Sequence, residues 1–264
     1  MTVKTSTLPF RYDQVGSLLR SSNLVQAREQ YKAGAITQNQ LINVENNEII
    51  RLIEKQKENG VLAITDGEFR RSWWHFDFLG GLDGVEYYEK EKGLEFHQME
   101  TRKEGIRIIG EIGFTTHPFV QHFEFLKQHA GEAVVKQTIP SPNMLIRRVD
   151  MNEEVYQDKE EFKQDIIVAY QNAIQAFYDA GCRYLQLDDT AWADLFSEEG
   201  HEKLRAKGLD PAEELVLMQQ MINESIANKP EDLTVTMHIC RGNYKSNYFT
   251  SGGYDYASEV IFGG

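Results

Sequence analysis

Apolar and polar residues follow two alternating patterns along this chain. Short continuous apolar runs, often rich in β-branched residues, are typical of strands buried on both faces. Between them, apolar residues recur every three or four positions, as on one face of a helix. The first pattern predicts strands over residues 10–15, 61–68, 106–112, 133–139, 182–189 and 233–240. The second predicts helices over residues 37–59, 119–129, 158–180, 210–226 and 254–262.

The repeated order of strand and helix predicts a parallel sheet covered by helices on both faces. An open, doubly wound sheet and a closed barrel both satisfy this order. No Gly-rich G-x-G-x-x-G motif follows the first predicted strand, so a dinucleotide-binding sheet has no support. Polar residues lie at the carboxyl end of nearly every predicted strand, and in a barrel all these ends meet at one end of the barrel. We therefore predict an α/β fold, a (βα)8 TIM barrel with about six βα units in this chain.

The domain organisation follows from the same pattern. Residues 1–264 are predicted to form a single TIM-barrel domain, truncated before strands seven and eight because only six strands are visible. Residues 84–105 are charged and aromatic and lack a clear helical period. We interpret them as an excursion such as a β-hairpin rather than as a separate domain.

The amino-acid composition argues against nucleic-acid-binding, membrane-bound, secreted and disulfide-rich classes of protein. With 28 Lys and Arg against 41 Asp and Glu, the net charge of −13 argues against nucleic-acid and anionic-membrane partners. The N-terminus lacks the apolar core of a signal peptide, and no segment reaches the roughly 18 apolar residues that a membrane span needs. Two cysteines, Cys182 and Cys240, are too few for a disulfide framework. We expect a cytoplasmic protein; its oligomeric state is left open.

The last predicted strand ends in two residues that commonly bind metals. Side chains alternate between the faces of a strand, so His238 and Cys240 are expected to point the same way. Imidazole and thiolate groups suit zinc. A buried cysteine beside a hydrogen-bonded histidine, without metal, is the plainer alternative. A stable zinc site needs three or four protein ligands, so this pair alone is incomplete.

Polar residues also lie at the ends of the earlier predicted strands. Ser17 and its preceding glycine could hold a carboxylate with backbone N–H groups and a hydroxyl, or could simply cap a helix. Glu68 and Asp188 end the second and fifth predicted strands, and Asp194 follows soon after the latter. In a barrel, these strand-end residues would surround one cavity with the histidine and cysteine. Cys182 begins its strand, about 20 Å from Asp188, and is expected in the core.

Four of these segments together resemble the catalytic barrel of cobalamin-independent methionine synthase, particularly its shorter, single-barrel bacterial relatives. They occur in the family's order and cover most of the chain. The matching segments are Val15-Gly16-Ser17, Asp66-Gly67-Glu68-Phe69-Arg70-Arg71, Leu185-Gln186-Leu187-Asp188-Asp189 and Met237-His238-Ile239-Cys240.

The resemblance implies an activity and roles for the acids. It implies a methyltransferase that converts homocysteine to methionine by methylating its thiol. Ser17 would bind the carboxylate of homocysteine, and Glu68 and Asp188 would hold its ammonium group. Asp194 matches a further acid of the family, shortened here from Glu. Asp188 and Asp194 are thus implied both as substrate-binding and as catalytic residues.

The resemblance also implies cofactors. His238 and Cys240 would be two zinc ligands, while the family's remaining ligands, a Glu and a Cys, and its proton-donating His belong to strands not present here. The donor implied is 5-methyltetrahydrofolate. However, in the family the fourth-strand segment ends in a Trp that stacks on folate, and residues 141–148 contain none. The identity of the methyl donor is therefore left open.

Two other functions remain compatible with the residues. A metal-independent decarboxylase of the uroporphyrinogen decarboxylase-like barrel group would use Arg70, Arg71, Arg147 and Arg148 to hold substrate carboxylates. A non-catalytic homocysteine- or thiol-binding protein would keep the pocket without the complete metal set. Zinc content, sensitivity to chelation and methyl transfer distinguish the three.

Overall fold

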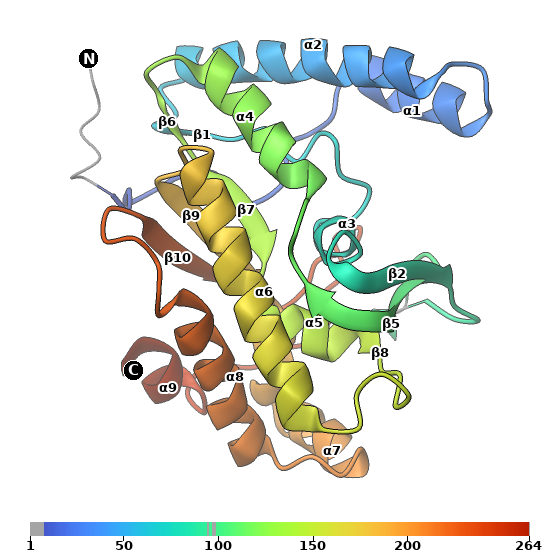
Figure 1. The fold of residues 1–264 in the computed structure, drawn as a ribbon, viewed down its shortest axis with the longest axis vertical. Coiled ribbons are helices and arrows are strands. Elements are labelled where there is room, and N and C mark those ends of the chain that lie inside the picture. The colour runs from blue at the N-terminus through green and yellow to red at the C-terminus, as the bar shows by residue number, and fades with distance from the viewer. Residues whose placement is uncertain (1–7, 94, 97–98, 264) are drawn as a thin grey trace.

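A computed structural model describes residues 8–263 except 94 and 97–98 (Figure 1). Its centre is a layer of parallel strands. Strand β1 (Ala63–Ile64) pairs with β6 (Val134–Val135), and β9 (Tyr184–Asp189) pairs with both β7 (Gln137–Pro140) and β10 (Thr234–Ile239). Only Lys136 separates β6 from β7, and its N–H donates to the Ile64 carbonyl at 2.9 Å. The strand order is therefore β1–β6/β7–β9–β10, with every pairing parallel.

This parallel layer with helical crossovers confirms the predicted α/β class. Strands β1 and β10 lie at its two ends, and no pairing among the described residues joins them. A closed barrel is therefore not seen in this part of the chain. Two of the strands end earlier than predicted. Residues 65–68 and residue 240 lie in the loops that follow these strands, and the loops carry the polar groups.

The long helices lie where the apolar spacing predicts them. Helix α2 (Gln38–Glu58) begins after Thr37, whose hydroxyl and the Gln40 side chain form a reciprocal capping box. Helix α6 (Lys159–Asp179) buries the predicted stripe that runs from Phe162 to Phe177. The other helices are α1 (Ser22–Lys32), α3 (Phe76–Leu79), α4 (Pro118–Ala130), α5 (Pro142–Arg148), η2 (Ala191–Leu195), α7 (Glu198–Ala206), α8 (Pro211–Ile226) and α9 (Ser258–Gly263).

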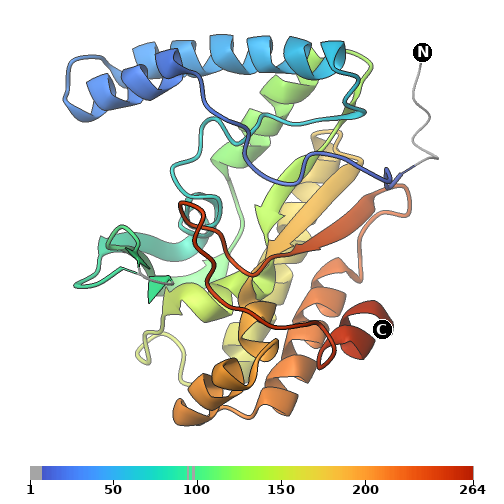
Figure 2. The same ribbon diagram turned by 180° about the vertical axis from the view of Figure 1, so that it is seen from behind.

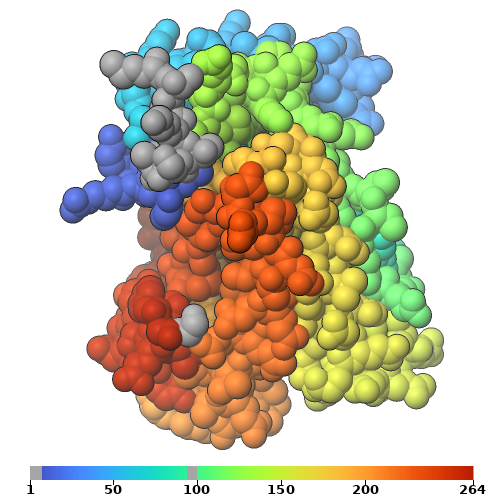
Figure 3. All heavy atoms as spheres, turned by 60° about the vertical axis from the view of Figure 1, so that its left-hand side comes forward, coloured from blue at the N-terminus to red at the C-terminus, as the bar shows by residue number. Residues whose placement is uncertain are grey.

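Helices α6 and α8 pack side by side on one face of the parallel layer (Figures 1 and 3). Their apolar faces join one large core that also contains Phe123, Leu185 and Leu187. Each fully buried aliphatic or aromatic side chain in such a core contributes about 1.5–3 kcal/mol. None of the helices in the described ranges combines the length and apolar character that a membrane crossing requires.

The prediction for residues 106–112 as a parallel barrel strand is wrong. They belong to β5 (Glu104–Gly113), which pairs antiparallel with β2 (Asp83–Glu89) and parallel with the short β8 (Val149–Asp150). Residues of β5 alternate between buried and exposed, as in a sheet with one solvated face. The excursion thus includes a hairpin that extends to Gly113. Within it, β3 (Glu95–Phe96) and β4 (Met99–Glu100) form a second small antiparallel pair.

The prediction of a strand over residues 10–15 is also wrong. This segment has no regular secondary structure and runs past the parallel strands (Figure 2). Its backbone is instead held by side chains: Lys136 Nζ donates to the Gln14 carbonyl at 2.9 Å, and Gln186 Nε2 donates to the Val15 carbonyl at 2.8 Å. The Lys136 side chain is 1% exposed and pairs with Asp13 at 3.0 Å. These contacts fix the approach of residues 16–18 to the ends of the strands.

Candidate functional site

A cavity of about 500 Å³ opens where β9 and β10 end. The loop after β1, the N-terminal segment and the loop after β10 complete its walls. A larger, more open hollow of about 750 Å³ lies beside the hairpin and α4; of the residues that the sequence predicts for a site, it is lined only by Arg70 of the decarboxylase alternative. Because the carboxyl ends of parallel strands are where α/β proteins bind ligands, the smaller cavity is the candidate site.

Five of the six predicted site residues line this cavity. They are Ser17, Glu68, Asp188, His238 and Cys240. The sixth, Asp194, is not among the lining residues; it lies on η2, and its charge acts on Arg148, which does line the cavity.

Cys182, which the sequence places in the core, is fully buried. Burial raises the pKa of its thiol to about 12, so this cysteine is unreactive at neutral pH.

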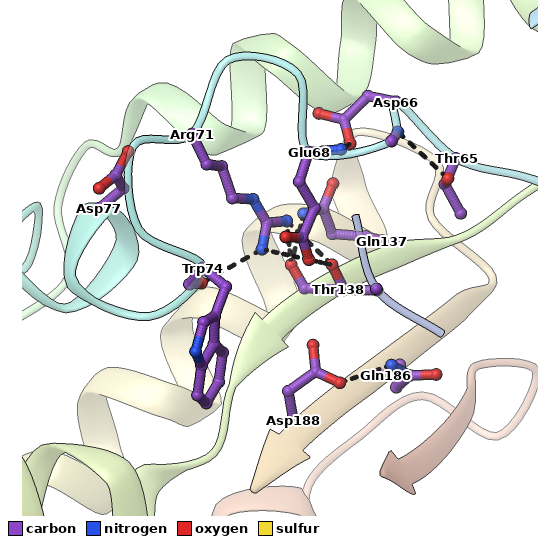
Figure 4. A network of polar contacts seen from close by, with 12 residues as sticks. Thr65, Asp66, Glu68, Arg71, Trp74, Asp77, Gln137, Thr138, Gln186 and Asp188 are labelled. Carbon is purple, nitrogen blue, oxygen red and sulfur yellow. Dashed lines mark hydrogen bonds and ion pairs between the residues drawn. The ribbon is translucent and has the colours of Figure 1, made fainter. Parts of the chain in front are cut away.

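A buried ion pair orients Glu68 (Figure 4). Arg71 donates from one guanidinium nitrogen to Glu68 Oε1 at 3.3 Å and from the other to the Thr138 carbonyl and hydroxyl, at 2.6 and 2.9 Å. Glu68 itself has a positive φ of 58°, a conformation that non-glycine residues rarely adopt. The Asp66 carboxylate accepts the Glu68 N–H at 2.8 Å and stabilises this turn. The strained backbone thus places the Glu68 carboxylate in the cavity wall.

Asp188 lies near Glu68 in the cavity wall. It is 6% exposed, and the Gln186 amide donates to its Oδ1 at 2.5 Å. Burial, and secondly the negative charge of Glu68, raise the pKa of Asp188 to about 8. At neutral pH this carboxyl is therefore largely protonated in the free protein. A cation that enters between the two acids would favour its ionised form, so the pair suits an ammonium group.

The strand register brings the possible metal ligands to the same end of the sheet. His238 pairs with Asp188 across β10 and β9, and the Cys240 N–H continues the ladder to the Asp189 carbonyl at 3.1 Å. Both side chains are partly buried and line the cavity. Burial, and secondly the charge of Lys136, lower the pKa of His238, which keeps the imidazole neutral and able to bind a metal.

The side-chain types of His238 and Cys240 fit zinc, but they are only two ligands. A structural or catalytic zinc site uses three or four protein ligands, and this pair supplies two. Within the described ranges, no three His, Cys, Asp or Glu side chains lie together in a metal-binding cluster.

Several cavity residues were not predicted. Trp73, Trp74 and His75 form one wall and come from the turn that follows Glu68, while Arg148 comes from the end of α5. The run of three aromatic residues that begins five positions after the strand-end Glu68 was an available signal. Arg148 was named only for the decarboxylase alternative; its place in this cavity depends on the short helix α5, which the apolar spacing did not reveal.

A parallel α/β layer with acids, an imidazole and a thiol gathered at its strand ends defines the class: an α/β protein whose pocket is suited to a small polar ligand. The family model "Cobalamin-independent synthase, Catalytic domain" matches residues 11–249. The chain belongs to this family, and the resemblance seen in its strand-end motifs is confirmed. Membership supports, in broad terms, a methyltransferase that acts on homocysteine.

Individual relatives agree with this assignment. The chain is 54% identical over 257 residues to the uncharacterized protein YxjG of Bacillus subtilis, which covers 97% of this chain and 68% of that protein. It is 24% identical over 232 residues to a methionine synthase of Saccharolobus solfataricus, covering 87% and 62%. A putative vitamin-B12 independent methionine synthase from Listeria monocytogenes has a similar structure, with a TM-score of 0.78, 47% identity, and coverage of 97% and 70%.

Proposed function

We propose that this protein transfers a methyl group to the thiol of homocysteine and forms methionine in a zinc-dependent reaction. The observation that carries the proposal is one cavity that combines an acidic pair, Glu68 and Asp188, with a neutral imidazole and a thiol, His238 and Cys240. The acids suit an ammonium group, and the other pair suits a soft metal that binds sulfur. Homocysteine carries both an ammonium group and a thiol.

The acids and the N-terminal segment would orient the amino acid. Glu68, oriented by its ion pair with Arg71, and Asp188 would bind the ammonium group, while the exposed Ser17 would donate to the carboxylate. Binding of the ammonium group would release the proton from Asp188. Such orientation of reacting groups can contribute about 7 kcal/mol or more. Asp194 lies outside the cavity lining, and we propose that it acts through its charge on Arg148.

His238 and Cys240 would be two of the zinc ligands. Zinc, when bound, keeps a coordinated substrate thiol in the thiolate form at neutral pH. The sulfur would then form its bond to the methyl carbon as the bond to the donor breaks and the electron pair stays with the donor. We propose 5-methyltetrahydrofolate as one candidate donor.

The structure gives less support to the decarboxylase alternative than to the methyltransferase. Of its four arginines, three are already engaged: Arg70 with Glu45 and Asn46, Arg71 with Glu68 and Thr138, and Arg147 with Glu214. A cluster of arginines free to hold several substrate carboxylates is therefore not formed by these four residues.

Zinc content tests the proposal. The purified full-length protein is expected to retain about one zinc ion per chain, and His238→Ala and Cys240→Ser are expected to lose it. Cys182→Ala is the matched control, because Cys182 is a buried core residue that does not line the cavity, and it should retain zinc. Normal zinc content in both site variants would contradict the proposal. Zinc and homocysteine binding without methyl transfer would favour the non-catalytic alternative.

A further inference from the structure

Gln186 is a buried residue of β9 that the proposed function does not use. It lies two positions before Asp188, so both side chains project from the same face of the strand. Only 4% of Gln186 is exposed. Its amide nitrogen donates to Asp188 Oδ1 at 2.5 Å, as Figure 4 shows, and to the Val15 carbonyl at 2.8 Å. One amide group thus joins an acid of the site to the N-terminal segment.

Both N–H groups of this amide are used. A primary amide has two N–H donors on its nitrogen, and a backbone carbonyl can only accept. The nitrogen of Gln186 must therefore face the Val15 carbonyl, and its second N–H is directed to Asp188. Methionine has a similar length and volume but no donor, so it would leave both acceptors unpaired. The two bonds consequently depend on a single side chain.

The N-terminal segment 13–18, which we call the clasp, is also held by the preceding part of the same strand. Tyr184 lies two positions before Gln186, and its hydroxyl donates to the Asp13 carboxylate. Lys136 pairs with the same carboxylate at 3.0 Å, and its side chain is 1% exposed. A buried cation is costly to leave unpaired, so this contact fixes the start of the clasp.

The clasp runs in step with β9. Its contacts at Asp13 and Val15 are two residues apart, and the residues of β9 that make them are also two apart. An extended chain advances about 6.6 Å over two residues, as a strand does. A further step of two brings Ser17 toward Asp188, and both residues line the cavity. The clasp thus carries Ser17 to the end of the strand that bears this acid.

The other end of the clasp is attached to the turn that carries Glu68. The Leu18 N–H donates to the Gly67 carbonyl at 3.1 Å. Arg20, just beyond the clasp, donates to the Glu68 carbonyl at 2.7 Å. The clasp therefore connects the two acids of the site, because Gln186 fixes it on one side and this turn fixes it on the other.

We propose that Gln186 is a positioning residue that couples recognition of the two charged ends of an α-amino acid. Its bonds keep the clasp, with Ser17 for the carboxylate, in a fixed position relative to Asp188, which faces the ammonium group. A site arranged in this way before the ligand arrives loses less entropy on binding. The pocket should therefore prefer a ligand that carries both groups on one carbon over a ligand that carries only one of them.

This role of Gln186 rests on the proposed function in one respect, the assignment of Ser17 to the carboxylate and of Asp188 to the ammonium group. It requires neither bound zinc nor methyl transfer. Absent zinc or absent methyl transfer would therefore contradict the proposed function and leave the binding of amino acids unchanged.

Three ligands of the purified full-length protein separate the two ends. L-Methionine, the proposed product, carries both charged groups; L-methioninol has an alcohol in place of the carboxylate, and methylthiobutanoate lacks the ammonium group. Binding is measured by calorimetry. The wild type should bind L-methionine about tenfold or more tightly than either of the other two, because each of them lacks a charge-assisted hydrogen bond.

Ser17→Ala and Gln186→Met should differ in the ligands that they affect. Ser17→Ala should weaken L-methionine binding about tenfold and leave L-methioninol binding unchanged. Gln186→Met should weaken L-methionine binding about 30-fold or more and L-methioninol binding much less, because only L-methionine uses the clasp. In the double variant, the loss should be no larger than in Gln186→Met alone, because Ser17 is then no longer held in place.

Gln171→Met is the matched control. The Gln171 amide also joins two elements, since it donates from α6 to the Glu224 carbonyl of α8 at 2.9 Å, and the residue does not line the cavity. Its replacement should lower the melting temperature and leave the affinities unchanged, and Ser17→Ala should keep its full effect in this background. If Gln186→Met does not fold, Gln186→Asn replaces it, because its shorter side chain cannot reach both partners.

Three results would overturn the proposal. The first is a double variant in which the effects of Ser17→Ala and Gln186→Met on L-methionine affinity are additive in free energy, since the two residues would then act independently. The second is an equal loss for L-methionine and L-methioninol in Gln186→Met, which would confine its role to the ammonium group. The third is equal affinity of the wild type for these two ligands, because no carboxylate would then be recognised.

Discussion

Replacement of Arg71 by Met is expected to lower the free energy of unfolding by about 3–5 kcal/mol. The Arg71 and Glu68 side chains are 3% and 7% exposed, so the change leaves a buried carboxylate without its cation. It also leaves the Thr138 and Trp74 carbonyls without the donors at 2.6 and 3.3 Å. Urea unfolding of the two proteins measures the difference.

Two further variants separate the ion pair from general packing. Arg205→Met removes the arginine of a solvent-exposed pair with Glu198, and it should leave stability nearly unchanged. The double variant Glu68→Gln with Arg71→Met should be more stable than Arg71→Met alone, because it removes the uncompensated charge. If Arg71→Met unfolds like the wild type, the buried pair does not support the site as described.

Asp188→Asn is expected to stabilise the protein while it weakens substrate binding. In the folded protein the pKa of Asp188 is about 8, against 3.8 in its ordinary state. Between these values the folded state binds more protons than the unfolded state, so the contribution of Asp188 to stability falls as pH rises through this window. Asn removes this dependence, and at pH 7 the variant should be more stable by about 1–4 kcal/mol.

The same substitution should weaken binding of L-methionine about 30-fold or more, because Glu68 alone would then face the ammonium group. For the wild type, affinity should increase with pH up to about 8, where Asp188 no longer has to release a proton on binding. Calorimetry across this pH range measures both effects. A variant with unchanged affinity and an unchanged pH profile would show that Asp188 does not hold the ammonium group.

Local sequence signals predicted helices α2, α4, α6 and α8 well but missed α1 and α7. Helices α2 and α6 have a capping residue at one end and a long apolar stripe, and neither signal depends on distant contacts. The strands were harder. A strand of a parallel layer and a strand of a hairpin can have the same apolar sequence pattern. Residues 106–112 were therefore assigned to the wrong sheet. Residues 10–15 look extended, but their backbone bonds to Lys136 and Gln186, which lie far along the chain.

The candidate site was predictable where it depends on strand ends. Glu68, Asp188 and His238 follow or close parallel strands, and the topology alone brings such positions together. The residues that hold these three side chains in place, and those that form the rest of the cavity wall, depend on loop conformation. Arg71 reaches Glu68 across a turn with a positive φ, and Arg148 reaches the cavity from a seven-residue helix. Neither geometry has a periodic signal in the sequence.

The coordination of the substrate sulfur tests the central proposal most directly. Zinc K-edge absorption spectra of the purified full-length protein would be recorded before and after addition of homocysteine. We expect one additional sulfur neighbour at about 2.3 Å from the zinc in wild type and in Cys182→Ala. A zinc shell that does not change when homocysteine is bound would contradict the account in which metal and acids act on one substrate in this cavity.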